Sequence, residues 1–133
     1  MLVAQARSLP PPACVIVGGE TTVTVRGRGR GGRCQEFALA AALALDSNDE
    51  LTVLAAGTDG TDGPTDAAGA VVDAKTVERG RAAGLDPDRS LADNDAYPFL
   101  DATGDLVVTG PTNTNLLDLY VVVRPARRVS EAV

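Results

Sequence analysis

Short β-branched or apolar runs alternate along this chain with segments rich in helix-forming residues, and this order constrains the fold most strongly. The runs have the length and composition of buried strands, whereas the Ala- and Leu-rich segment 35–45 has no helix breaker. The expected strands are 14–17, 21–25, 51–56, 70–72, 106–108 and 119–123, and the expected helices include 35–45 and 74–83. The order of elements predicts an α/β fold.

The connections between these elements predict a mixed sheet. Gly18-Gly19-Glu20 separates the first two runs and is typical of a β-hairpin turn. Later strands are joined through helices, which is typical of parallel crossovers. We therefore expect an α/β single domain, with a mixed sheet, a β-hairpin start and helices packed on the sheet. With 133 residues, the chain has room for one core and no second domain.

The ends of the chain differ in composition from its middle. Residues 1–13 resemble a remnant helix followed by the linker Leu9-Pro10-Pro11-Pro12, and residues 125–133 form a polar tail. The domain proper is expected over residues 14–124. No apolar run approaches the roughly 18 to 20 residues of a membrane span, and the start lacks a signal-peptide pattern, so we expect a cytoplasmic protein without membrane contact.

Composition excludes several classes of chemistry. The chain contains no histidine, which removes serine–histidine triads, histidine zinc sites and imidazole acid–base catalysis. A formal charge of −6 and 3% aromatic residues argue against nucleic-acid binding. Two cysteines give neither a disulfide framework nor a metal knuckle. Chemistry must therefore depend on carboxylates, arginines and backbone amides, acting on a small molecule.

A first candidate site is the Arg-Gly segment between the second expected strand and the first long helix. Amides at the helix start, the positive helix end and forked guanidinium groups together predict a receptor for a carboxylate or a phosphate. A solvated Arg-Gly turn is the alternative. The spelling G-x-G-x-x-G is weak support for a dinucleotide site, because a hairpin arm precedes it. The segment contains Arg26, Gly27, Arg28, Gly29, Arg30, Gly31, Gly32 and Arg33.

A second candidate site is the polar loop 57–69, which directly follows an apolar run. Its short carboxylates and hydroxyls suit magnesium or a hydroxylated substrate, although Asp and Thr also cap their own turns. The spacing of the carboxylates excludes an EF-hand. Its candidate ligands are Thr58, Asp59, Thr61, Asp62, Thr65 and Asp66. The polar segment 109–115, which contains Thr112, is a third loop that we expect to meet the other two at one edge of the sheet.

At these residues the chain resembles the MOFRL domain, the C-terminal domain of the glycerate 2-kinase family, whose members were formerly named hydroxypyruvate reductases. The resemblance extends in order over about residues 15–123. It is carried by Gly18-Gly19-Glu20-Thr21-Thr22-Val23-Thr24-Val25-Arg26-Gly27, Gly29-Arg30-Gly31-Gly32-Arg33, Gln35-Glu36-Phe37-Ala38-Leu39, the whole loop 57–69, Thr109-Gly110-Pro111-Thr112 and Thr114-Asn115.

The resemblance implies ATP-dependent phosphorylation of D-glycerate to 2-phosphoglycerate with Mg²⁺, in a cleft shared with a Rossmann-like N-terminal domain. Arg30 and Arg33 would bind the glycerate carboxylate or the transferred phosphate. Asp59 and Asp62 would bind magnesium or the attacking hydroxyl. The expected catalytic residues are Arg30, Arg33, Asp59 and Asp62, and the expected substrate- or phosphate-binding residues are Gly27, Gly29, Gly31, Gly32, Thr58, Thr61, Thr65, Asp66 and Thr112.

The chain departs from the family pattern in three respects. Cys34 replaces a usual Asn, and we expect it to be a packing residue; an acidified thiol with a redox role, at the start of a helix, is the disfavoured alternative. Ala96 replaces a usual Ser. The N-terminal domain is missing, so we expect inactivity alone and either self-association or binding to that domain. The alternatives are a hydroxypyruvate reductase, disfavoured because no convincing nicotinamide site is present, and a non-catalytic binding or assembly module.

Overall fold

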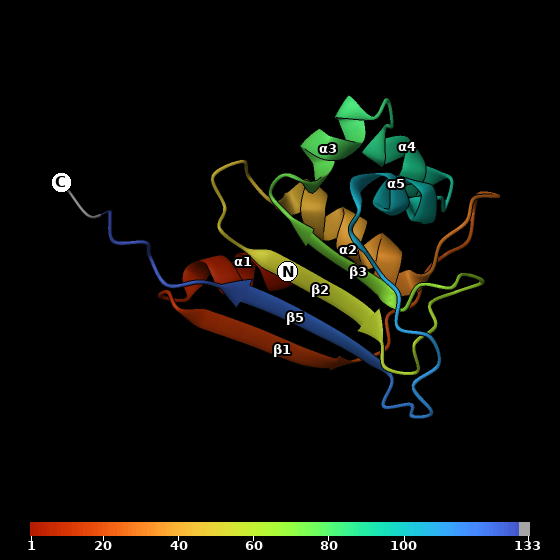
Figure 1. The fold of residues 1–133 in the computed structure, drawn as a ribbon, viewed down its shortest axis with the longest axis horizontal. Helices are drawn as coiled ribbons and strands as arrows, with labels where there is room; N and C mark the ends of the chain where they lie inside the picture. Colours follow the sequence, from red (N-terminus) through yellow and green to blue (C-terminus); the bar gives the residue numbers. More distant parts are fainter. Residues whose placement is uncertain (131–133) are drawn as a thin grey trace.

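The protein is described by a computed structural model over residues 1–130, and its central feature is one five-stranded sheet (Figure 1). The strand order is β1-β5-β2-β3-β4, and every pair of neighbours is antiparallel. The strands are β1 (Ala13–Gly19), β2 (Thr52–Gly57), β3 (Gly69–Asp73), β4 (Leu106–Val107) and β5 (Asp118–Arg124). The single α/β domain expected from the sequence is confirmed, with helices packed on the sheet.

The expected mixture of parallel and antiparallel pairs is wrong, and the position of β5 explains why. β1 and β2 both run antiparallel to β5, so they point in the same direction and are joined through a helix, as the sequence predicts for a crossover. However, β5 lies between them. The strand that separates the crossover partners is contributed by the last part of the described chain, which local sequence patterns do not reveal.

The expected hairpin at the start of the domain does not form. β1 pairs over its whole length with β5, from Ala13 opposite Arg124 to Gly19 opposite Asp118. Residues 21–25 contain no strand, and Val25 is 76% exposed. Seven paired residues on an apolar partner strand outweigh the local turn preference of Gly18-Gly19.

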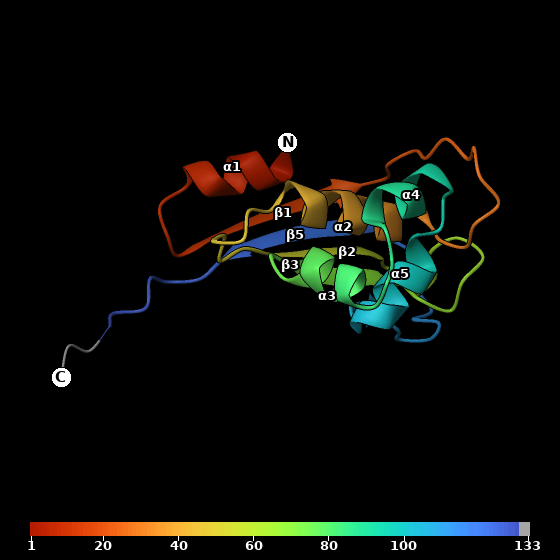
Figure 2. The same cartoon turned by 90° about the horizontal axis from the view of Figure 1, so that it is seen from above.

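The helices cover one face of the sheet and extend beyond one edge of it (Figures 1 and 2). α1 (Leu2–Ser8) packs on β1 and β5, and α2 (Arg33–Ala44) packs on β2 and β3. Three short helices pack against α2 and against one another: α3 (Thr76–Ala82), α4 (Pro87–Ala92) and α5 (Ala96–Thr103). The main core lies between α2 and the inner face of β2, β3 and β5.

The N-terminal helix belongs to this core. Val3 and Ala6 of α1 are buried in it. Arg7 forms an ion pair with Asp49, and Arg124 donates to the carbonyl of Arg7. The segment that the sequence sets apart as a remnant helix and linker is therefore packed against the domain. Residues 125–130 form no helix or strand, and the last three residues of the expected polar tail lie outside the described part of the chain.

The opposite face of the sheet is apolar and carries no helix within residues 1–130 (Figure 1). Ile16, Val121, Leu54 and Val71 lie side by side across β1, β5, β2 and β3, and Ile16 is 65% exposed. Across the same residues, no helix is long and apolar enough to cross a lipid bilayer.

The glycine inside α3, which weakens the helix prediction, is explained by packing. The ring of Phe99 from α5 occupies the place where a side chain at Gly80 would lie, and both residues are buried. Alanine is the better helix former by about 1 kcal/mol, but overpacking of a core costs about 1 to 3 kcal/mol.

We therefore expect Gly80→Ala to lower the free energy of unfolding by about 1 to 2 kcal/mol, because the clash with Phe99 exceeds the gain in helix propensity. Urea denaturation monitored by circular dichroism measures this change. The control is Arg81→Ala at an exposed position of the same helix, which should change stability by less than about 0.5 kcal/mol. Stabilisation by Gly80→Ala would contradict the packing described.

Candidate functional site

Three polar loops meet at one end of the sheet (Figure 1). They are the arginine loop (residues 26–33), the aspartate loop (residues 57–69) and the threonine loop (residues 109–117). Thr112 of the threonine loop donates its amide to the carbonyl of Asp59 at 3.2 Å and its hydroxyl to the carbonyl of Thr58. Thr58 in turn donates its amide to the carbonyl of Leu117 at 3.0 Å. The second and third loops are thus joined by backbone hydrogen bonds.

Asp62 joins the aspartate loop to the end of the arginine loop. Its two carboxylate oxygens accept the amides of Cys34 at 3.0 Å and Gln35 at 2.9 Å, and it is 0% exposed. Gly32 allows this approach, since a Cβ there would overlap the Asp62 carboxylate. Two of the amides at the start of α2, those of Cys34 and Gln35, are therefore capped from within and are not free for a ligand, in contrast to the expectation from the sequence.

Buried hydrogen bonds reinforce this cap. Gln35 donates its side-chain amide to the hydroxyl of Thr65 at 2.9 Å, and that hydroxyl donates to the carbonyl of Asp62 at 2.7 Å. Both Gln35 and Thr65 are buried. Thr65, which the sequence suggests as a ligand-binding residue, thus lies beneath the loop and stabilises its shape.

Arg33 is held by an acidic partner from β5. Its Nε and Nη2 atoms donate to the two oxygens of Asp118 at 2.6 and 2.8 Å, a bidentate geometry. Asp118 is buried, and the hydroxyl of Tyr120 donates to it at 3.2 Å. The hydrogen bonds with Asp118 raise the pKa of Arg33 above its usual value, so its charge is permanent. A carboxylate oxygen of Glu20, whose side chain is 55% exposed, lies 3.8 Å from Nε of Arg33.

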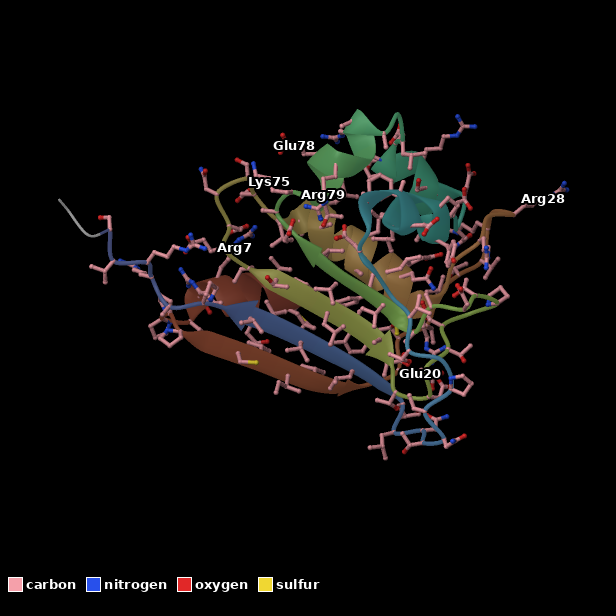
Figure 3. The ribbon with its side chains drawn as sticks, viewed as in Figure 1. Arg7, Glu20, Arg28, Lys75, Glu78 and Arg79 are labelled. Carbon is pink, nitrogen blue, oxygen red and sulfur yellow. The ribbon has the colours of Figure 1, made fainter. Side chains whose placement is uncertain are left out.

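The other arginines of the arginine loop have different surroundings. The guanidinium carbon of Arg30 lies 4.0 Å from the centre of the Tyr97 ring, and Tyr97 donates its hydroxyl to Asp66 at 2.7 Å. Arg26 and Arg28 are exposed, and the side chain of Arg28 points away from the domain (Figure 3). Among residues 1–130, neither Arg26, Arg28 nor Arg30 forms an ion pair.

The glycines of the arginine loop are held by a segment between α4 and α5. The amides of Arg26 and Gly27 both donate to the side-chain oxygen of Asn94, at 2.7 and 2.8 Å, and the amide of Gly29 donates to the carbonyl of Asp93 at 2.9 Å. Asn94 is buried and has a positive φ of 54°. Two of the amides expected to bind a phosphate are therefore used inside the protein. Gly31 lies beside Ala96, the first residue of α5.

Asp59 is more accessible than Asp62, the other residue expected to bind a metal. One of its carboxylate oxygens accepts the amide of Thr61 at 2.9 Å, which leaves the other oxygen without a protein hydrogen bond among the described residues. Asp62, by contrast, uses both oxygens in the helix cap. Within residues 1–130, no cluster of three or more acidic or cysteine side chains has the geometry of a metal site. The residues present fit Mg²⁺ only as a single-carboxylate site that phosphate and water would complete.

Comparisons with known proteins identify the family of this chain. The family model described as MOFRL family matches residues 13–118. The chain belongs to the MOFRL family. It is 52% identical over 115 residues to a D-glycerate 2-kinase of Thermotoga maritima, covering 86% of this chain and 28% of that protein. A relative from Agrobacterium vitis that is 44% identical bears the name hydroxypyruvate reductase, and the alignment covers 92% of this chain and 29% of that relative.

Solved structures support the same assignment. A crystal structure of a glycerate kinase from Thermotoga maritima aligns with a TM-score of 0.86 at 50% sequence identity, covering 90% of this chain and 29% of that one. A structure from Pyrococcus horikoshii gives the same TM-score at 40% identity and covers 94% of this chain and 29% of the other. This MOFRL chain therefore spans less than a third of the length of these relatives.

Sequence patterns miss several residues that shape this MOFRL site. Asp118 could have been noticed in the sequence, because it is an acidic residue at the start of an apolar strand. Asn94 and Asp95 resemble an ordinary helix start, and their contacts with the arginine loop join residues more than 60 positions apart. Tyr97 is one of only four aromatic residues, and nothing in the sequence pairs it with Arg30.

Cys34 of the MOFRL chain packs inside the domain core, as expected from the sequence. It is fully buried, and burial raises the pKa of its thiol well above the usual value, with the negative charges of Asp62 and Asp118 acting in the same direction. The alternative of an acidified thiol is therefore wrong, chiefly because Cys34 is buried and secondarily because the Asp62 carboxylate lies at the start of α2. Cys14 is exposed on the open face of the sheet.

We expect one thiol of the folded chain to react with Ellman's reagent at pH 8, because Cys14 is exposed whereas Cys34 is buried and protonated. Unfolding in urea should release the second. A Cys14→Ser variant should lose the fast phase and Cys34→Ser should keep it. Rapid reaction of both thiols in the folded wild type would contradict the environment described for Cys34.

A second expectation concerns Asp62. Asp62→Ala should lower the free energy of unfolding by about 2 to 3 kcal/mol, because two buried amides of α2 lose their acceptor. Urea titrations in the presence of EDTA and of Mg²⁺ should give the same loss. The matched control is Asp59→Ala in the same loop, with an expected loss below about 1 kcal/mol. A loss for Asp62→Ala that appears only with Mg²⁺ would indicate a metal ligand.

Proposed function

We propose that this chain is the C-terminal module of an ATP-dependent glycerate 2-kinase, which transfers a phosphoryl group to D-glycerate to form 2-phosphoglycerate. The observation that carries the proposal is the likeness to proteins named as glycerate kinases, at 52% identity and a TM-score of 0.86. These relatives are more than three times as long as the aligned region. An N-terminal Rossmann-like domain is therefore the proposed partner, and the active site lies between the two.

The arginine loop supplies the positive charge in this proposal. Arg30 has an exposed guanidinium free of ion pairs among the described residues, so it binds the glycerate carboxylate or the transferred phosphate. Arg33 is partly exposed, with 29% of its side chain accessible, but two of its nitrogens are committed to Asp118. It contributes a fixed positive charge beside the site and orders the start of α2.

The aspartate loop supplies the oxygen ligands. Asp59 is the proposed ligand for Mg²⁺ or for the attacking hydroxyl, through its free carboxylate oxygen. The metal would neutralise charge that develops on the phosphates of ATP when it is bound. Thr61 is exposed and lies next to Asp59, whereas Thr58 and Thr112 fix the backbone that carries it. We assign Asp62 to positioning, since its cap leaves no free oxygen.

Phosphoryl transfer suits a chain without histidine. Such transfer depends on positioned charges and metal ligands more than on a group that titrates near neutral pH. A reductase would instead need a site for a nicotinamide cofactor. The G-x-G-x-x-G spelling does not supply one, because the amides of Gly27 and Gly29 are already used by Asn94 and Asp93. The kinase proposal is therefore favoured over the reductase.

A coupled assay for ADP release tests the proposal with D-glycerate, ATP and Mg²⁺. We expect no turnover by this chain alone and turnover after mixing with the separately expressed N-terminal part of the Thermotoga maritima relative. Arg30→Ala and Asp59→Ala should each lower kcat/KM of the mixture at least tenfold, because each removes a group that contacts the phosphate, the metal or the substrate.

The matched control is Arg28→Ala, which removes one exposed arginine of the same loop and should leave kcat/KM within about twofold. Circular dichroism checks that each variant is folded. Turnover by the isolated chain would contradict the need for a second domain. Equal losses from Arg28→Ala and Arg30→Ala would contradict a specific site at Arg30, and NADH oxidation with hydroxypyruvate would favour the reductase instead.

A further inference from the structure

The backbone of Arg30 is held by residues 93–97, which lead from α4 into α5. Its amide donates to the side chain of Asp95 at 2.8 Å, and its carbonyl accepts the amide of Tyr97 at 2.9 Å. The neighbouring amide of Gly29 donates to the carbonyl of Asp93. The backbone that carries Arg30 is therefore held in place, although the residue itself is exposed.

The same segment also holds the side chain. The guanidinium carbon of Arg30 lies 4.0 Å from the centre of the Tyr97 ring, which is a cation–π stacking distance. A guanidinium stacked on a ring keeps its N–H donors at the edge of the plane, where they remain available for a carboxylate or a phosphate. Stacking also removes part of the rotamer freedom that a long side chain loses on binding.

Tyr97 is itself held by the aspartate loop. Its hydroxyl donates to Asp66 at 2.7 Å, and this bond is the largest cause of the raised pKa of Tyr97. The phenol therefore stays protonated and keeps this donor at neutral pH. Tyr97 contacts the arginine loop with its ring and the aspartate loop with its hydroxyl, so this side chain is a second link between the two loops, beside Asp62.

We propose that Tyr97 is a positioning residue that holds the guanidinium of Arg30 ready for the anionic group of the substrate. The substrate part of this inference rests on the function proposed above. It separates Arg30 from the other arginines of the loop: Arg33 is paired with Asp118, and neither Arg26 nor Arg28 stacks on an aromatic ring among the described residues.

The positioning is tested first in the free protein by NMR of the arginine Nε–Hε groups. Arg30 should show slow exchange, a rigid Nε–Hε vector and an upfield ring-current shift, whereas Arg28 should be mobile. Tyr97→Phe keeps the ring and should preserve these signatures. Tyr97→Leu removes the ring and should make Arg30 resemble Arg28. An Arg30 signal that is mobile in the wild type, or unchanged in Tyr97→Leu, would overturn the proposal.

The substrate role is tested by titration of the full chain, mixed with the N-terminal part of the relative, with D-glycerate. Tyr97→Leu should raise Kd about threefold to fivefold, the effect of losing one exposed cation–π contact, and Tyr97→Phe should stay within about twofold. Arg30→Ala should raise Kd at least as much as Tyr97→Leu. The double variant should add little to Arg30→Ala, since Tyr97 acts through Arg30.

The outcomes separate the two proposals. If Arg30→Ala weakens binding and Tyr97→Leu does not, the positioning role is wrong and the kinase proposal stands. If Arg30→Ala leaves D-glycerate affinity unchanged while the NMR signatures of Arg30 are as expected, the assignment of Arg30 to the substrate is wrong and the inferred role of Tyr97 falls with it. Thermal denaturation of Tyr97→Leu shows whether a weaker affinity reflects unfolding.

Discussion

The pairing of the Asp62 carboxylate with the amides of Cys34 and Gln35 is the interaction on which the rest of the site depends. It places a negative charge at the positive end of α2 and removes two orphan donors from a buried position. Because Asp62 belongs to the aspartate loop and α2 begins at the end of the arginine loop, the same contact fixes one loop against the other. The buried amide of Gln35 then holds the turn that follows.

The charged groups divide into those that build the site and those that remain open to a ligand. Arg33 and Asp118 neutralise each other where β5 begins, in a pair whose carboxylate is buried and whose guanidinium is partly exposed. Both carboxylate oxygens of Asp62 are likewise used in the cap of α2. Arg30 and Asp59 keep free donor and acceptor positions at the surface of their loops. This division leaves Arg30 and Asp59 as the candidates for contact with a ligand. It assigns Arg33 and Asp62 to positioning.

The sequence predicts where strands and helices lie along the chain better than it predicts which strands pair with each other. Periodicity and composition identify β2, β3, β5 and α2 within a few residues, because these properties are local. They fail for the expected hairpin, since the partner of β1 is β5, about 100 residues away. The polar loops can be recognised as candidate sites from their composition. The sequence does not reveal which carboxylate caps a helix and which one stays open to a ligand. That difference depends on contacts, such as that of Asp62 with Cys34, which only the folded chain makes.

The arginine loop shows the same limit. Four arginines within eight residues predict an anion site, and they are equivalent in the sequence. The fold makes them unequal by placing Asp118 beside Arg33 and Tyr97 beneath Arg30. The open apolar face of the sheet, which includes Ile16 and Val71, is a further property that depends on the strand order.

We propose that the three loops form one site for an anionic, hydroxylated substrate. The most direct test of this proposal is a ¹H–¹⁵N map of backbone amide shifts in the ¹⁵N-labelled chain, bound to the N-terminal part of the relative and titrated with D-glycerate. We expect saturable changes confined to residues 26–33, 57–66 and 109–117. Changes that cluster on the open face of the sheet, or no saturable change in any of these loops, would contradict it.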